Sequence, residues 1–143
     1  MRNTVSFFAL VAGLALAGCS TYQKRWEAAR AGGSAYEGRW ESSKMPGTGG
    51  HLWCILDCER TGDYRALFKA TWHGIFRSEH EAVLGVVSRE GKTTKFTGRA
   101  KLDTWIGSGE YRCDGELRPD GISAEYDASY DQGRFFLKKA AAK

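Results

Sequence analysis

The 143-residue sequence has few of the groups on which enzymes most often rely, and it contains only three histidines. Neither a Gly-x-Ser-x-Gly nor a His-Glu-x-x-His element occurs in it, so the machinery of serine hydrolases and zinc proteases is missing. The net charge is only +4, with both signs mixed along the chain. This argues against a nucleic-acid partner, because such proteins carry a concentrated basic face. We expect a protein that is not an enzyme and that has no metal or cofactor.

The N-terminus has the layout of a secretory signal peptide. Arg2 supplies a short positive region, and the apolar stretch from Val5 to Ala17 is too short for the roughly 20 residues of a membrane-spanning helix. Leu16-Ala17-Gly18-Cys19 resembles the lipobox of bacterial lipoproteins, in which the cysteine is lipidated and begins the mature chain. The resemblance implies cleavage after residue 18, acyl chains such as palmitate on Cys19, and attachment to a cell-envelope membrane. In a host with an outer membrane, it implies the outer membrane. A non-lipidated signal peptide or an uncleaved anchor is the alternative.

Lipidation of Cys19 would leave thiols on Cys54, Cys58 and Cys113. A disulfide is permitted outside the cytoplasm, but three thiols cannot all pair within one chain. We expect one bridge between Cys113 and either Cys54 or Cys58. The spacing of Cys54 and Cys58 also suits zinc, but no second closely spaced ligand pair follows it, so no metal site is predicted.

A short helix is predicted over residues 21–31, and Gly32-Gly33 would end it. Tyr22, Trp26 and Ala29 recur at spacings of four and three, which puts them on one helix face. A helix of this length is marginal in isolation. We therefore expect Trp26 to dock on the domain that follows, with the membrane surface as the alternative.

From residue 35 onward, apolar residues alternate with polar ones, as in strands with one buried and one exposed face. Turn signals at 61–63, 90–92, 107–109, 119–121 and 131–133 separate the runs. No helical pattern interrupts the series, which favours an antiparallel meander of about eight strands that closes, or nearly closes, into a small barrel. The predicted fold class is therefore all-β, with a short N-terminal helix before the barrel.

The chain is divided accordingly. Residues 1–18 form the signal peptide, and residues 19–34 hold the lipidated cysteine, the helix and a glycine-rich hinge. Residues 35–139 form the barrel and residues 140–143 a tail. Aromatic side chains predominate on the face expected to point inward: Tyr36, Trp40, Tyr64, Phe68, Trp72, Phe96, Tyr111, Tyr126 and Tyr130.

Seven of these aromatic residues are candidates for lining a ligand cavity: Trp40, Tyr64, Phe68, Trp72, Phe96, Tyr111 and Tyr126. The interior of eight strands is just wide enough to be filled by side chains or to hold one small ligand. We expect a filled interior, with a cavity for a small apolar molecule as the alternative. The tyrosine hydroxyls keep that alternative open, because they need partners that water or a ligand could supply.

Several motifs resemble those of uncharacterised small bacterial lipoproteins with calycin-like, lipocalin-related barrels. They are Gly38-Arg39-Trp40, His51 before Leu52 and Cys54, Tyr64 with Ala66, Ala70-Thr71-Trp72, Tyr111 with Cys113 and Gly115, and Gly133 with Phe135 and Leu137. The resemblance implies the barrel fold and brings no activity with it, since a shared fold does not imply a shared function.

The expected role is therefore non-enzymatic binding or interaction at the cell envelope, with the membrane, other envelope components or a small apolar ligand as partners. A carrier of an apolar molecule is one alternative. An inhibitor of a cell-wall hydrolase is another, because Ser108-Gly109-Glu110-Tyr111 resembles a loop of lysozyme-inhibiting lipoproteins, one residue shorter.

Two polar groupings could bind ligands, but we expect a structural role for each. His51, His73 and His80 could in principle bind zinc or copper, but we expect them to be surface or strand-end residues. A basic strand face could meet anionic polymers or lipids, but we expect it to be a solvated face that resists edge pairing. That face is formed by Lys92, Lys95, Arg99 and Lys101.

Overall fold

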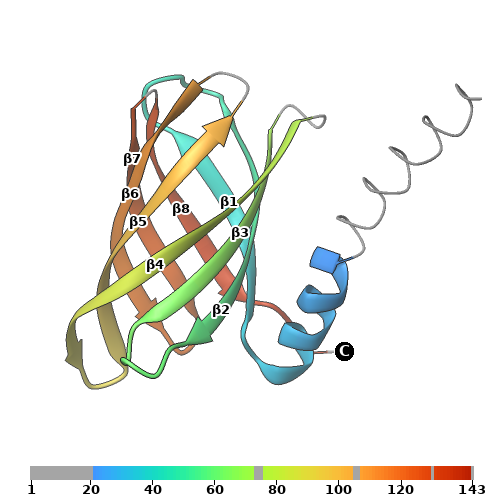
Figure 1. Ribbon diagram of the computed structural model, residues 1–143, viewed down its shortest axis with the longest axis vertical. Coiled ribbons are helices and arrows are strands. Elements are labelled where there is room, and N and C mark those ends of the chain that lie inside the picture. The colour runs from blue at the N-terminus through green and yellow to red at the C-terminus, as the bar shows by residue number, and fades with distance from the viewer. Residues whose placement is uncertain (1–20, 73–75, 105–106, 130, 143) are drawn as a thin grey trace, which may run out of the picture.

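The computed structural model describes residues 21–72, 76–104, 107–129 and 131–142. Eight antiparallel strands close into a barrel in which each strand lies beside its neighbours in sequence and β1 pairs with β8 (Figure 1). The predicted fold class is confirmed. The strands are β1 (Ala35–Ser42), β2 (Gly49–Cys58), β3 (Tyr64–Trp72), β4 (Phe76–Glu90), β5 (Thr93–Thr104), β6 (Gly107–Arg118), β7 (Gly121–Ala128) and β8 (Asp131–Lys139).

The core of the barrel consists of the apolar residues at alternate positions of each strand, as the period-two pattern predicts. The largest fully buried side chains are Phe68, Phe135, Leu84, Cys54 and Cys113. We call the end formed by the β1–β2, β3–β4, β5–β6 and β7–β8 connections the upper end, as in Figure 1, and the opposite end the lower end.

Large interior side chains lie beside very small ones. A Cβ atom built on Gly98 of β5 would come within 2.6 Å of the Cys113 sulfur and of a Leu84 methyl carbon. Cys113 and Leu84 lie on the two strands that flank Gly98. The missing side chain at Gly98 is thus what lets these two groups pack toward each other inside the barrel.

Two of the predicted turns are wrong. Residues 107–109 belong to β6 and residues 131–133 to β8. Glycine and aspartate favour turns in isolation, but Gly133 serves a different purpose here: a Cβ at this position would lie 2.5 Å from the Tyr126 hydroxyl oxygen. It is a point of close approach between a ring and the next strand.

Residues 21–32 are helical and pack against the outside of the barrel, which confirms the predicted helix and its docking. Tyr22, Trp26 and Ala29 are buried with Ala35, Ile55 and Ala140 in a second core outside the barrel. Gly33 ends the helix with a φ of 79°, and the Ser34 amide donates to the Ala29 carbonyl at 2.9 Å. No helix among the described residues has the length and apolar character needed to cross a membrane.

The end of the chain joins this second core. The Ala140 amide donates to the Ala35 carbonyl at 2.9 Å, and the Arg30 side chain donates to the Ala141 carbonyl at 2.9 Å. The predicted tail is therefore fixed, at least through Ala141, between the helix and β1.

The ladder between β4 and β5 covers only part of the two strands. Their register runs only from Val83 opposite Arg99 to Glu90 opposite Thr93, whereas β4 pairs with β3 along its first part as far as Phe76 opposite Trp72. Within the described residues, positions 76–82 of β4 therefore have no ladder partner on β5. The two strands diverge toward the upper end (Figure 1).

We expect Trp26→Ala to lower the free energy of unfolding by about 3–5 kcal/mol, because it removes a buried indole from the second core. Denaturation followed by circular dichroism checks this. The control is Lys24→Ala at an exposed position of the same helix, for which a change within about 0.5 kcal/mol is expected. Equal effects of the two substitutions would show that the helix is not docked.

Candidate functional site

The upper end of the barrel interior holds a pair of aromatic rings and a buried carboxylate. Trp40 and Tyr126 meet edge to face with ring centroids 6.4 Å apart, and the Trp40 indole donates to the Thr71 carbonyl at 3.0 Å. The Tyr126 and Ser42 hydroxyls donate to the two oxygens of Asp131, at 2.8 and 2.6 Å. Asp131 is the one polar residue that is buried among the described positions. The sequence predicts a turn here, but Asp131 begins β8.

The rings continue downward from this pair. Tyr126 stacks on Tyr111 at 5.9 Å, Tyr111 meets His80 edge to face at 5.1 Å, and His80 stacks on Phe68 at 5.1 Å. We call the five residues Trp40, Tyr126, Tyr111, His80 and Phe68 the aromatic column. Ala100 stands opposite Tyr111 on β5, and this small residue leaves room for the Tyr111 ring of β6 to reach His80 on β4.

His80 is the unusual member of the column. Its two ring nitrogens are shielded from solvent, and neither has a hydrogen-bond partner among the described residues. Burial lowers the pKa of the imidazole from 6.5 to about 4, so the ring is neutral at physiological pH and carries one donor and one acceptor. The pattern could have revealed this position, because the alternation of Ala82 and Leu84 extends back to residue 80.

The two thiols and the Tyr111 hydroxyl inside the barrel are also held neutral. Burial raises the pKa of the Cys54 thiol above its usual range and that of the Cys113 thiol to about 12. The pKa of Tyr111 is raised well above 10, first by burial and then by the neighbouring Cys113. Neither thiol is therefore a nucleophile near neutral pH.

In the described part of the chain, Cys54, Cys58 and Cys113 are all free thiols. The expected bridge from Cys113 is therefore not formed here, and the ring order explains why. Cys113 lies on β6, and three strands separate β6 from β2 in either direction around the barrel. A disulfide needs Cα atoms within about 7 Å, a span scarcely wider than one strand-to-strand step.

The structure brings four of the seven predicted lining residues together, namely Trp40, Phe68, Tyr111 and Tyr126, as members of the aromatic column. Trp72 is partly buried at the upper end of β3. Tyr64 and Phe96 lie near the lower end, away from the aromatic column. Tyr64 is the first residue of β3, and Phe96 is the fourth residue of β5. Tyr130 lies outside the described residues.

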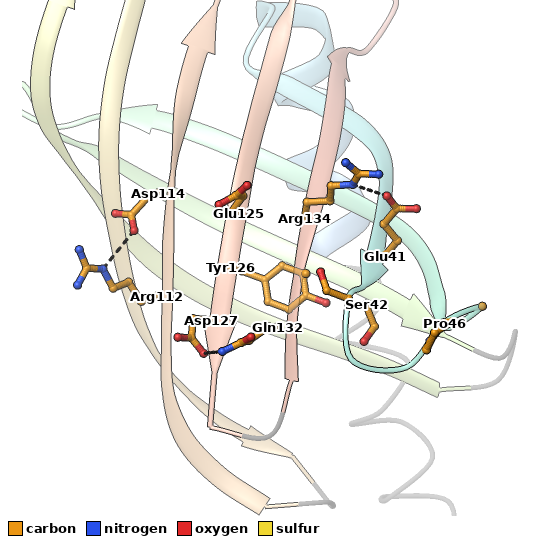
Figure 2. A pocket seen from close by; sticks show the side chains of 13 residues that line it. Glu41, Ser42, Pro46, Arg112, Asp114, Glu125, Tyr126, Asp127, Gln132 and Arg134 are labelled. Atoms are coloured by element: carbon orange, nitrogen blue, oxygen red, sulfur yellow. Dashed lines mark hydrogen bonds and ion pairs between the residues drawn. The ribbon is translucent and has the colours of Figure 1, made fainter.

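A groove of about 660 Å³ runs along the outside of the barrel beneath the β1–β2 connection. Figure 2 shows its side chains, with Arg112 paired to Asp114, Arg134 paired to Glu41, and the Gln132 amide directed at Asp127. A second hollow of about 550 Å³ lies along β1 and β8 and includes the exposed ring of Phe136. Most charged side chains of the first groove are thus paired with another side chain of the same groove.

The remaining sequence candidates are not gathered into a site. His51 is exposed beside Trp53, whereas His80 is inside the barrel, and His73 lies outside the described residues. No group of three or more His, Cys, Asp or Glu side chains that could hold a metal is found among the described residues. Ser108-Gly109-Glu110-Tyr111 is part of β6 rather than a loop.

The basic face of β5 is exposed, as expected, but acidic residues of β6 stand beside it. Lys95 is opposite Glu116 and Lys101 is opposite Glu110, while Arg99 faces Arg112. This local pairing reduces the positive potential that an anionic partner would meet.

The comparisons with known proteins support the fold alone. No protein-family model and no curated protein matches the chain. Among solved structures, the chain is similar to one described as "De novo design of a fluorescence-activating beta barrel", with a TM-score of 0.50 and 17% sequence identity over 79% of this chain and 97% of that one. At this identity, the likeness establishes a closed antiparallel barrel and says nothing of a ligand.

The buried imidazole predicts a pH dependence of stability. His80 has a native pKa of about 4 and an ordinary value of 6.5, so between these values the unfolded chain binds a proton that the native protein does not. The stability contributed by the neutral ring is complete above pH 6.5 and is lost as the pH falls toward 4. His80→Phe should therefore lose less stability than the wild type between pH 6.5 and 4.5, measured by urea denaturation. Replacement of the exposed His51 by Phe serves as the control, and parallel pH curves for wild type and His80→Phe would contradict the prediction.

Proposed function

We propose that this chain is a lipid-anchored, non-enzymatic binding protein of the bacterial cell envelope, and that its barrel takes up a small, largely apolar molecule at the upper end. We also propose, from the sequence motifs, that the chain is related to small bacterial lipoproteins of calycin-like fold. The observation that carries it is the aromatic column, which runs from partly buried rings at the upper end to the buried ring of Phe68.

The two halves of the barrel interior differ in a way that favours a ligand at the upper end. In the lower half, Leu84, Phe96 and Ile122 are at most 3% exposed and fill the space between the strands. At the upper end, Trp40 and Tyr126 are partly buried beside the Asp131 carboxylate. Tyr64 and Leu117 are partly buried at the lower end, but no buried carboxylate lies beside them among the described residues. Aromatic walls with a few placed polar groups are typical of small-molecule sites.

Binding is favoured over catalysis by the state of the interior groups. Burial moves the pKa values of Cys54, Cys113 and Tyr111 upward and that of His80 downward. Each group is thus neutral near pH 7 and has a pKa far from that pH, whereas acid–base catalysis requires pKa values near the operating pH. The Asp131 carboxylate is occupied by two hydroxyl donors.

The envelope location rests on the lipobox-like Leu16-Ala17-Gly18-Cys19. Thr21, the first described residue of the helix, is two residues after Cys19, and the helix is docked on the barrel through Tyr22 and Trp26. Two residues span at most about 7 Å, so an acylated Cys19 would hold the barrel against the membrane rather than on a long tether.

Ligand uptake is tested with N-phenyl-1-naphthylamine, a neutral apolar probe whose fluorescence rises when it leaves water. The wild-type protein should bind it, and Trp40→Leu should weaken binding by about fivefold, since one aromatic contact contributes on the order of 1 kcal/mol. Trp53→Leu is the matched control, because Trp53 packs outside the barrel against the helix. Absence of binding to the wild type, or equal losses in both variants, would refute uptake at the upper end.

Anchoring is tested by labelling bacterial cells with radioactive palmitate while they express the full chain. The label should enter the wild type and fractionate with membranes, and Cys19→Ala should abolish both results. Cys58→Ser, which alters an exposed thiol, should leave them unchanged. A wild-type chain that takes up no label would overturn this part of the proposal.

A further inference from the structure

His80 breaks a rule that the rest of the interior obeys. Buried polar groups in proteins are nearly always hydrogen-bonded, and a buried donor or acceptor without a partner is destabilising. The interior hydroxyls of Tyr126 and Ser42 have a partner in Asp131, yet both nitrogens of His80 lack one among the described residues. Such a local conflict is expected where a site has been kept for binding rather than for stability.

Nothing in the packing of the ring calls for nitrogen atoms. His80 lies between Phe68 and Tyr111, with ring centroids 5.1 Å away on each side. A phenylalanine would offer the same flat face to both neighbours and would carry no unpaired polar atoms. The imidazole therefore provides hydrogen-bonding capacity that the described residues of the barrel do not use.

Small side chains and a stretch of strand without a ladder partner lie next to His80. The side chains next to it on β3 and β4 are small, with Ala70 opposite Ser78 and Ala66 opposite Ala82. His80 also lies in the part of β4 that has no ladder partner on β5 within the described residues. The imidazole thus lies on the stretch of β4 that has no ladder partner on β5 in the described residues, and below the rings of the upper end.

We infer that His80 is the polar anchor of the ligand site, and that the ligand is a neutral, planar aromatic molecule carrying a hydroxyl or a similar small hydrogen-bonding group. One imidazole nitrogen forms the hydrogen bond that orients the molecule, and its flat part lies against rings of the aromatic column above His80. This inference rests on the proposed uptake of a small molecule and adds the class of ligand and the residue that selects it.

The electrostatics of the position favour a neutral ligand. The groups around the imidazole are the rings of Phe68 and Tyr111, and burial is the sole cause found for the lowered pKa of His80. No charged partner for a cationic or anionic group is therefore supplied by the described residues at this point. A hydroxyl can donate to the unprotonated nitrogen without bringing a charge into the barrel.

The inference is tested with two probes of similar size, 2-naphthol and 2-methylnaphthalene, each measured by displacement of N-phenyl-1-naphthylamine. The ratio of their dissociation constants in the wild type is compared with the ratio in His80→Phe and in His80→Leu. If His80 binds the hydroxyl, the preference for 2-naphthol should fall by about tenfold in both variants, while 2-methylnaphthalene binds His80→Phe about as well as the wild type.

Stability provides a second, independent readout. His80→Phe should raise the Tm of the ligand-free protein by about 4 °C, because it removes unpaired polar atoms and keeps the stacking. Tyr22→Phe is the matched control, since the Tyr22 hydroxyl is likewise buried without a partner in the described part of the chain, but lies under the external helix. It should also raise the Tm, and it should leave the probe preference unchanged.

The outcomes separate this inference from the proposed function. If the wild type binds both naphthalenes and the preference for 2-naphthol survives in His80→Phe and His80→Leu, the role of His80 is refuted and uptake by the barrel stands. If neither naphthalene nor N-phenyl-1-naphthylamine binds the wild type, the proposed function itself fails. A lowered Tm of His80→Phe would also count against the inference, because it would mean that the imidazole stabilises the empty barrel.

Discussion

The width of the barrel interior is the constraint on which the rest of the structure depends. Eight strands enclose a space only just wide enough for packed side chains or one small ligand, so a large side chain fits best where an adjacent strand carries a small residue. Gly98 makes room for Cys113 and Leu84, Ala100 stands opposite Tyr111, and Gly133 accommodates Tyr126. The course of the aromatic column through the barrel follows from this placement of small residues.

Much of this arrangement is readable from the sequence, because alternation is a local property of the chain. Tyr36, Leu52 and Phe68 face inward as their strands predict, and Trp26 docks where the helical spacing directs it. The strand ends were harder to predict. Asp131 and Gly133 favour a turn when considered alone, and only the neighbouring Tyr126 and Ser42 explain why they occupy a strand.

Contacts between strands that are distant in sequence cannot be predicted from the alternation of apolar and polar residues. The distance between Cys54 and Cys113 depends on the strand order, which places their strands on opposite walls, and alternation does not encode that order. His80 is an intermediate case. Its inward direction could be extrapolated from Ala82, but the absence of hydrogen-bond partners depends on side chains from β3 and β6. The candidate site was therefore foreseeable as a set of rings, and its polar centre was not.

The pairing of β1 with β8 has a consequence for how the chain matures. The first strand of the barrel cannot complete its ladder until residues 133–139 have been synthesised. Until then, a seven-stranded sheet would present two unpaired edges, which favour aggregation. The strand that is made last is thus the one that removes both edges at once, so the barrel closes in a single step rather than strand by strand.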